Sequence, residues 1–352
     1  MQQYLDLVEL ILKEGIHKPN RTGVDTIAYF DGHHRINLLF GFPLLTTKRV
    51  PWRLVVEELL WFLRGEKNIA SLVNKNVTIW NEWAYERYKD SGGDLGLDAF
   101  NNRLKEDQKF AKEHGDLGPI YGYQWRSFEG VVSGVEHGTR EIIVVDQIKE
   151  VIDNLRNNPE SRRIILNAWN PAQIKDMALA PCHVLYVFNV MGGRLNLHMT
   201  QRSADIALGV PFNIASCAAL THIIGQEVGI KPGIFGHTLV DMHVYCGDGE
   251  NFGLRRRGVW YKENLGELRN RMKEVRTAED YLAIKRWIED NAPEESRPGL
   301  DHIPGLLLQL TRRPKTLPLL EIAKKPLDQL VGEDFKVNGY TPDRHIRFEI
   351  AV

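Results

Sequence analysis

Cysteine is scarce in this chain, with three residues among 352. The odd number and wide spacing of Cys182, Cys217 and Cys246 do not indicate a disulfide framework, and reduced thiols are typical of a cytoplasmic protein. No apolar run approaches the roughly 20 residues that span a bilayer. The acidic Asp6 and Glu9 near the start are unlike the basic head of a signal peptide. The sequence therefore predicts a cytoplasmic protein with no membrane partner.

Neither sign of charge is in excess. The chain has 45 Lys and Arg residues and 46 Asp and Glu residues, which gives a formal net charge of −1. General nucleic-acid binders usually carry a basic excess, so we expect that no nucleic acid is required. A near-neutral protein can still contain a local anion pocket. Hydrophobic residues make up 43% and charged residues 26%, which is typical of a globular protein.

The chain mixes helix and strand patterns without regular alternation, which predicts an α+β fold in a single domain over residues 1–352. Residues 2–14 have helical spacing, and residues 54–63 are apolar almost all round, as in a buried helix. Asn213 lies at the N-cap position of a helix expected to run to Val228. Strand-like runs occupy residues 26–30, 35–39, 143–145, 163–169, 184–190 and 194–200, and we expect the third, fourth and fifth to be buried.

Two polar, charged stretches have the character of insertions, at residues 86–115 and 246–300. The second contains a predicted helix over residues 278–289, with Thr277 as its cap. Both are expected to be additions to one catalytic domain.

Three arginine sites suit phosphate binding, because a planar guanidinium can grip two oxygens: Arg21, the pair Arg162 and Arg163, and Arg202. A surface salt bridge is the alternative for any one of them. The pair opens an otherwise apolar strand pattern, RIILNAW, so at least one of its members should face a ligand or a partner.

Two further side chains could carry chemistry. Cys182 lies at the start of a strand pattern, where nearby basic groups could make its thiol nucleophilic, although an inert buried thiol is an equal alternative. Cys217, inside an apolar helix, favours the inert role. Glu58 lies within the apolar run of residues 54–63; it either flanks the surface with Glu57 or is buried with a raised pKa suited to proton transfer.

Several polar and aromatic residues remain open between structural and ligand-binding roles. Asn213 could simply cap its helix, or its amide could read a pyrimidine edge. His243 and Tyr245 share one face of a strand pattern and could converge on a hydroxyl. Trp80 and Trp83 could pack in the core or stack on a flat heterocycle.

Taken together, these motifs resemble the thymidylate synthase family across nearly the whole chain outside the two insertions. The matching segments are NRTGV (20–24), GFPLLTTKR (41–49), EELLWFLRG (57–65), NVTIWNEWA (76–84), GDLGPIYGYQWR (115–126), SRRIILNAWNP (161–171), MALAPCH (177–183), QRSADIALGVPFNIAS (201–216), DMHVY (241–245), RPKTLP (313–318) and the closing residues 350–352.

The resemblance implies a role for each matched position. Cys182 corresponds to the nucleophile that adds to C6 of uracil, and Asn213 to the amide that reads O4 and N3. The other catalytic positions, in the proton-handling network and at the folate side, are Glu58, Tyr121 and Asp205. The phosphate, base and sugar positions are Arg21, Arg202, Ser203, His183, His243 and Tyr245. The folate positions are Ile79, Trp80, Trp83, Asp205, Ala351 and Val352 with its carboxylate.

Arg162 and Arg163 correspond to a pair that reaches across a dimer interface into the neighbouring site. The resemblance thus implies a homodimer with shared active sites, in which a sheet face forms the interface. The implied reaction is the reductive methylation of dUMP to dTMP. In that reaction 5,10-methylenetetrahydrofolate is both carbon donor and reductant, dihydrofolate is released, and no metal is needed.

The chain departs from the family pattern at a few positions, most of them expected near the folate edge. Asn81, Pro51 and Cys217 stand where Asp, His and Tyr are common, and the chain re-enters the pattern at Asp301-His302. One alternative is a pyrimidine hydroxymethylase on the same fold, in which water replaces hydride. Another is a catalytically silent RNA-binding or structural protein.

Overall fold

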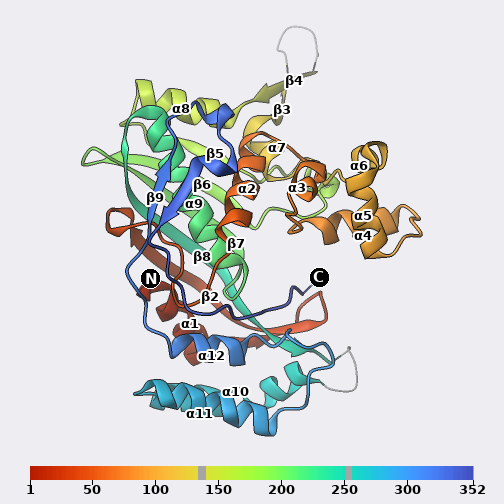
Figure 1. Cartoon of the computed structure of the whole chain (residues 1–352), viewed down its shortest axis with the longest axis vertical. Coiled ribbons are helices and arrows are strands. Elements are labelled where there is room, and N and C mark those ends of the chain that lie inside the picture. Colours follow the sequence, from red (N-terminus) through yellow and green to blue (C-terminus); the bar gives the residue numbers. More distant parts are fainter. Residues whose placement is uncertain (134–139, 251–255, 352) are drawn as a thin grey trace.

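A computed structural model describes residues 1–133, 140–250 and 256–351, and Figure 1 shows a central sheet with helices packed around it. The six-stranded sheet has the order β1-β2-β8-β7-β6-β5. Only β7 and β8 pair in parallel; the other neighbours are antiparallel. The strands are β1 (Ile16–Lys18), β2 (Val24–Asn37), β5 (Ile165–Asn167), β6 (His183–Met191), β7 (Arg194–Asp205) and β8 (Lys231–Asp248). The fold is therefore a mixed sheet combined with helices, as predicted.

Helices cover one face of this sheet and extend beyond its ends. They are α1 (Gln2–Glu14), α2 (Trp52–Leu63), α3 (Ala70–Asn74), α4 (Asn81–Asp90), α5 (Leu97–Glu106), α6 (Gln108–His114), α7 (Tyr121–Arg126), α8 (Gln147–Asn157), α9 (Gly209–Val228), α10 (Arg257–Glu274), α11 (Ala278–Asn291) and α12 (Ile303–Leu310). Two hairpins stand apart: β3 (Phe128–Ser133) with β4 (Arg140–Val145), and β9 (Leu319–Ile322) with β10 (Phe335–Asn338). Within the described ranges, no helix is long and apolar enough to cross a bilayer.

The alternating pattern of β7 was predicted correctly. Leu195, Leu197 and Met199 are buried, while the intervening side chains lie on the opposite face. The apolar face of the strand thus packs into the core, and the rest of the strand carries its polar side chains toward the outer face or the cavity at its carboxyl end.

The buried helix α2 was also predicted correctly, but the possibility that Glu57 and Glu58 flank the surface is wrong. Both side chains are buried. Glu57 is paired with the Lys75 ammonium at 2.7 Å. Burying a carboxylate is costly unless it is paired or protonated, so Glu58 requires a separate explanation.

Four of the predicted strand runs need correction. Residues 26–30 and 35–39 do not form two strands, because the single long strand β2 continues through them to Asn37. Residues 143–145 are not buried: they lie in β4 of a projecting hairpin (Figure 1), and Val144 is 60% exposed. The strand expected at residues 163–169 is confined to Ile165–Asn167, with Ile165 exposed. An apolar run alone does not reveal which face meets a core.

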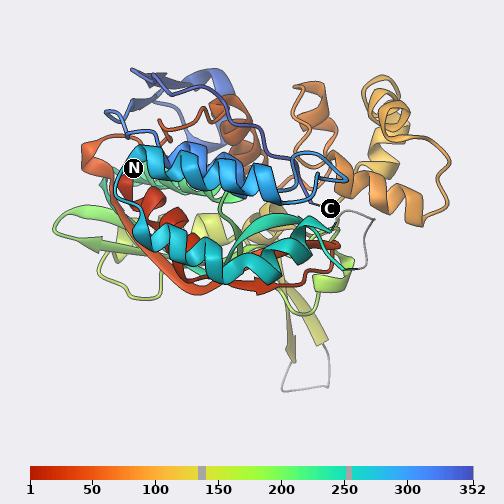
Figure 2. The ribbon, with the colours of Figure 1, turned by 90° about the horizontal axis from the view of Figure 1, so that it is seen from below.

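Both stretches interpreted as insertions are largely helical. Residues 86–115 run from α4 through α5 and α6, which lie to one side of the sheet (Figure 1). Residues 246–300 contain α10 and α11, which lie side by side next to α1 and α12 in both views (Figures 1 and 2). Thr277 is the N-cap of α11, as the sequence predicted, and Asp280 completes a capping box with it.

The chain leaves and re-enters the sheet at one place. Cys246 and Asp301 form an antiparallel bridge, and the His302 amide donates to the Tyr245 carbonyl at 3.0 Å. This contact lies at Asp301-His302, where the sequence was expected to re-enter the family pattern. Residues 247–300 are a closed excursion from the end of β8.

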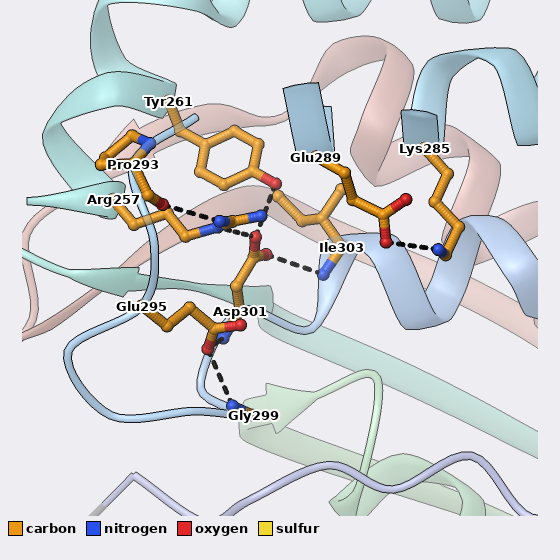
Figure 3. Close-up of polar contacts among 9 residues, drawn as sticks. All are labelled: Arg257, Tyr261, Lys285, Glu289, Pro293, Glu295, Gly299, Asp301 and Ile303. Atoms are coloured by element: carbon orange, nitrogen blue, oxygen red, sulfur yellow. Dashed lines mark hydrogen bonds and ion pairs between the residues drawn. The ribbon is translucent and has the colours of Figure 1, made fainter. Parts of the chain in front are cut away.

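A buried polar cluster holds the two ends of this excursion together (Figure 3). The Arg257 guanidinium and the Tyr261 hydroxyl both donate to Asp301 Oδ2, at 2.5 and 2.8 Å. Arg257 also donates to the Pro293 carbonyl at 2.8 Å, and Asp301 Oδ1 accepts the Ile303 amide at 3.1 Å. The Asp301 side chain is fully buried, so its charge depends on these partners.

Replacing Asp301 with Ala should destabilise the fold, because it leaves the Arg257 charge buried without its partner. We expect a loss of about 3–5 kcal/mol in the free energy of unfolding, measured by denaturant titration. Asp153→Ala is the matched control, since its ion pair with Lys149 is exposed on a helix surface and should contribute less than about 1 kcal/mol. Equal effects of the two substitutions would show that the cluster does not anchor the excursion.

Candidate active site

A cavity of about 620 Å³ opens between the ends of β7 and β8, the start of α9 and the segment before α4. It brings together most of the residues singled out from the sequence. Those lining it are Arg21, Glu58, Ile79, Trp80, Trp83, Tyr121, Cys182, His183, Arg202, Ser203, Asp205, Asn213, His243, Tyr245 and Ala351. Among the described residues of the lining, Arg162 and Arg163 do not occur; both are exposed just before β5. Val352 lies outside the described residues.

Arg202 holds the segment that carries Cys182. Its Nε donates to the Pro181 carbonyl and its Nη2 to the Ala180 carbonyl, both at 2.8 Å. Its backbone amide donates to the Cys182 carbonyl at 2.8 Å. The Tyr121 hydroxyl oxygen accepts the Cys182 amide at 2.6 Å from the other side. Cys182 is thus fixed in position immediately before β6 begins at His183.

Two opposing effects act on this thiol. Burial raises the pKa of Cys182, because it disfavours the thiolate, whereas the Arg202 and Arg21 guanidinium groups favour the charged form. Burial is the larger effect. The resting protein therefore holds a protonated thiol, and the two guanidinium groups favour its thiolate form.

Glu58 lies deep in the cavity wall. The Trp80 indole Nε1 donates to Glu58 Oε1 at 2.9 Å. Burial raises the pKa of Glu58 to about 7, and the Trp80 hydrogen bond only partly opposes this. The Tyr121 ring is tilted by 36° against the His183 ring, with centroids 4.5 Å apart, and Tyr121 interacts electrostatically with both Glu58 and Cys182. A carboxyl group that titrates near neutrality is suited to receive and return protons.

Asn213 is not the N-cap of α9, contrary to the structural expectation. The helix begins at Gly209, so Asn213 lies inside its second turn. Its Oδ1 accepts from Gln201 Nε2 at 3.0 Å, and its Nδ2 lies 3.1 Å from His183 Nε2. The side chain therefore faces the cavity, where its amide is held on both sides.

His183 continues this set of contacts. Its Nδ1 lies 2.6 Å from the Tyr186 hydroxyl. Burial lowers the pKa of His183 to about 3, so the ring is neutral at pH 7. Because its Nε2 faces the Asn213 amide nitrogen, the ring proton lies on Nδ1 and is donated to Tyr186.

The residues expected at phosphate and sugar line the same cavity. His243 and Tyr245 lie on one face of β8, as predicted, with ring centroids 5.4 Å apart. His243 Nδ1 lies 3.0 Å from the Asp241 carbonyl, so its other nitrogen is directed away from the strand. Arg21 is exposed at the mouth, on the turn before β2. A cationic side chain, an imidazole and a phenol thus line one cavity.

The folate-side candidates form an apolar wall. Trp80 and Trp83 lie with ring centroids 5.4 Å apart, and Ile79 and Ala351 line the same cavity. Asp205 Oδ1 accepts the Ala207 and Leu208 amides at 2.9 and 3.3 Å, which fixes the turn into α9. Flat apolar surface beside a carboxylate fits a heterocycle with ring N–H groups, such as the pterin of a folate. Across the described ranges, no group of His, Cys, Asp or Glu has the arrangement of a metal site.

Sequence reasoning missed some lining residues. Gln201 precedes Arg202 in the QRS motif but received no role, although it contacts Asn213 directly. Glu82 also lines the cavity, and burial raises the pKa of its carboxyl group. The departure at Asn81 has a structural counterpart: its Nδ2 donates to Asn101 Oδ1 of α5 at 2.8 Å. No local pattern identifies such contacts in advance.

Glu58 should make stability depend on pH. Its pKa is raised from an ordinary 4.5 to about 7, so its favourable contribution is complete below about pH 4.5 and is lost as pH rises through 7. Glu58→Gln should remove this loss and be more stable than the parent at pH 8, by up to about 3 kcal/mol. Chemical unfolding at several pH values, at one protein concentration, measures this. Glu160→Gln, at an exposed position, is the control and should leave the pH dependence unchanged.

Comparisons with known proteins show which family the chain belongs to. The family model described as thymidylate synthase matches residues 2–352. The thymidylate synthase of Haloferax volcanii is 42% identical over 351 residues, which cover 98% of this chain and 95% of the relative. That of Mycoplasma genitalium is 47% identical over 247 residues, covering 70% and 81%. That of Listeria innocua is 38% identical, with both chains covered in full. The chain belongs to the thymidylate synthase family and is a methyltransferase enzyme.

Proposed function

We propose that the chain catalyses the reductive methylation of dUMP to dTMP with 5,10-methylenetetrahydrofolate as co-substrate. The observation that carries this proposal is that one cavity holds a thiol whose charged form two arginines favour, a fixed amide and a buried carboxyl group that titrates near neutrality. These are Cys182, Asn213 and Glu58. A thiol that adds to a ring, an amide that reads the ring and an acid that exchanges protons suffice for pyrimidine C5 chemistry.

Cys182 supplies the nucleophile. Its thiolate adds to C6 of the uracil ring, the C5–C6 double bond opens, and the negative charge moves to O4 with C5 as the nucleophilic carbon. The bound folate supplies the one-carbon group and the hydride. C5 forms a bond to the one-carbon group and loses its proton, and the bond from that carbon to the folate nitrogen breaks. The hydride converts the resulting methylene on C5 to a methyl group, which leaves the folate as dihydrofolate. Elimination of Cys182 then restores the C5–C6 double bond and the free thiol. The cations of Arg202 and Arg21 favour the thiolate at both ends of this sequence.

Asn213 reads the base in this proposal. Its amide, oriented by Gln201 and His183, presents Nδ2 for donation to O4 and Oδ1 for acceptance from N3–H. Both groups of uracil are then satisfied. Glu58 and Tyr121 exchange protons around O4 and C5, through hydrogen bonds available on that wall of the cavity.

The lining residues also suggest where each ligand lies. Arg21, Arg202 and Ser203 bind the phosphate, and His243 and Tyr245 bind the sugar 3′-hydroxyl. The folate lies against the apolar wall, with Ile79, Trp80, Trp83, Asp205, Ala351 and Val352 as its binding residues. The retained Trp80 and the C-terminal segment favour hydride transfer over the entry of water, which separates the proposal from pyrimidine hydroxymethylation.

The sheet face opposite the helices supports a homodimer. Apolar side chains are exposed there, with Ile165 43% and Met191 71% exposed, and a hollow of about 460 Å³ lies over β2, β6, β7 and β8. Exposed apolar surface of this kind favours burial against another chain. Arg162 and Arg163 lie beside this face and reach the partner's site in the dimer, so each site uses residues of both chains.

The remaining proposals concern the chain as a whole. The helices of residues 86–115 and 246–300 pack on the same core as the sheet, which supports a single catalytic domain over residues 1–352 with two insertions. A cytoplasmic location rests on Cys182, Cys217 and Cys246 being free thiols.

Cys182→Ala should abolish methylation, by at least about a thousandfold in turnover, because no other group replaces the nucleophile. The measurement is dihydrofolate release from dUMP and methylenetetrahydrofolate, which also separates methylation from hydroxymethylation because only methylation oxidises the folate. Cys217→Ala and Cys246→Ala are matched controls, as both thiols are buried away from the cavity lining, and they should retain turnover. Substantial turnover by Cys182→Ala would contradict the proposed mechanism.

Mixing two inactive variants should restore activity if sites are shared. Arg162→Ala/Arg163→Ala lacks the arginines, and Cys182→Ala lacks the nucleophile. Their heterodimer contains one complete site, so random re-assortment should return about a quarter of the parent activity.

The control partner for this mixture carries all three substitutions and cannot complete any site, so it should restore nothing. Heterodimer formation is checked with two differently tagged chains. Heterodimers that form without regaining activity would show that each site is built within one chain.

A further inference from the structure

A line of buried polar side chains leads from the middle of the sheet to Asn213. His34 in β2 and His237 in β8 are direct register partners on the core side of the sheet. His34 Nε2 lies 3.0 Å from His237 Nδ1, and His237 Nε2 lies 3.0 Å from Gln201 Oε1. Gln201 Nε2 then donates to Asn213 Oδ1 at 3.0 Å. Two histidines outside the cavity lining are thereby connected to the residue proposed to read the base.

The direction of every hydrogen bond in this line follows from one fixed group. Gln201 Nε2 also donates to the Ser203 carbonyl at 2.9 Å, and a carbonyl can only accept. The Gln201 amide therefore turns its Oε1 toward His237. His237 must donate from Nε2, which leaves its Nδ1 to accept from His34.

Both histidines are neutral, so each has one donor and one acceptor. Burial lowers the pKa of His34 to about 4, and it lowers that of His237 well below its ordinary value, with His34, His183 and His198 adding to the effect. The line therefore requires one tautomer, with the proton on Nε2, at both rings.

Stability alone does not account for a pair of histidines, His34 and His237, in the core. His34 Nδ1 has no hydrogen-bond partner within the described part of the chain, although the residue is only 7% exposed. An unsatisfied buried polar atom costs about 1–3 kcal/mol. Two apolar side chains at positions 34 and 237 would avoid that cost. The histidine pair is therefore better explained by its contact with the Gln201 amide.

We infer that His34 and His237 are positioning residues that fix the Gln201 amide and, through it, the orientation of Asn213 that accepts uracil and rejects cytosine. The inference rests on the proposed function, because it extends the role of Asn213 in reading the base. Neither histidine touches the substrate. His237 orients Gln201, and His34 holds His237 in the tautomer that can do so.

The selectivity arises because cytosine needs the opposite amide. Its N3 accepts and its 4-amino group donates, so Asn213 would have to turn by half a rotation. That turn would place Asn213 Nδ2 against Gln201 Nε2 and Oδ1 against the His183 Nε2 lone pair, two unfavourable contacts. Gln201 could relieve the first contact only by turning too, which the His237 donor and the Ser203 carbonyl oppose.

The test compares variants that remove or keep one donor. His237→Phe removes the donor to Gln201 while keeping a flat ring, and His237→Gln keeps an N–H near the position of Nε2. His34→Leu leaves His237 in place and removes only the group that selects its tautomer. His222→Phe is the matched control: His222 packs against Phe42 and lies outside this line.

The measurement is the ratio of the dissociation constants of dCMP and dUMP, obtained by calorimetry with the full-length protein. His237→Phe should lower this ratio about tenfold, as expected for one unmet buried hydrogen bond, and His34→Leu should lower it in the same direction. His237→Gln should restore most of it, and His222→Phe should not change it. Asn213→Asp gives the ratio expected when base reading itself is altered.

The histidine tautomers provide a readout that packing alone would not move. In ¹⁵N spectra of the parent protein, His237 should carry its proton on Nε2, and in His34→Leu it should populate both tautomers. A parent His237 protonated on Nδ1, or an unchanged dissociation-constant ratio in folded His237→Phe and His34→Leu, would overturn the inference. A parent protein that fails to bind dUMP would overturn the proposed function instead.

Discussion

The grip of Arg202 on residues 180–182 is the interaction on which the candidate site depends. One side chain and its own backbone amide bind three successive carbonyls, so the nucleophile's segment is fixed to the end of β7. The same guanidinium is the main favourable charge near the Cys182 thiol. Position and reactivity therefore have a common origin. Because β7 is central in the sheet, with β6 and β8 on either side, the segment is held by a well-buried part of the fold.

Around this point several buried polar groups hydrogen-bond to one another before any ligand binds. Trp80 meets Glu58, Tyr121 meets the Cys182 amide, and Gln201 and His183 meet Asn213. Such a network is costly if it is half satisfied and rigid if it is complete. A cavity wall built in this way needs little rearrangement to receive a pyrimidine, which is the condition for discriminating between bases by hydrogen bonds.

The long excursion after β8 also contributes to the site, although its helices lie away from it. It returns at Asp301, and the adjoining Gly299 carbonyl accepts the Glu349 amide at 3.1 Å. His302 Nε2 lies 3.0 Å from the Glu349 carbonyl. The segment leading to Ile350 and Ala351 at the cavity therefore runs along the place where the excursion ends. An insertion at this position adds helices to the outside while leaving the path of the C-terminal segment anchored.

Local sequence determined the elements with strong periodicity, such as α1, α2 and β7, and the capped start of α11, because these depend on neighbours a few residues apart. Its motifs also indicated the family and most cavity residues. Only the tertiary structure decided that residues 143–145 project in a hairpin, that Asn213 lies within α9, and that Gln201 contacts it. His34 and His237 are 203 residues apart in the chain, and they meet because β2 pairs with β8 in one register. Strand pairing is set by the burial of the whole sheet, so no local pattern contains it.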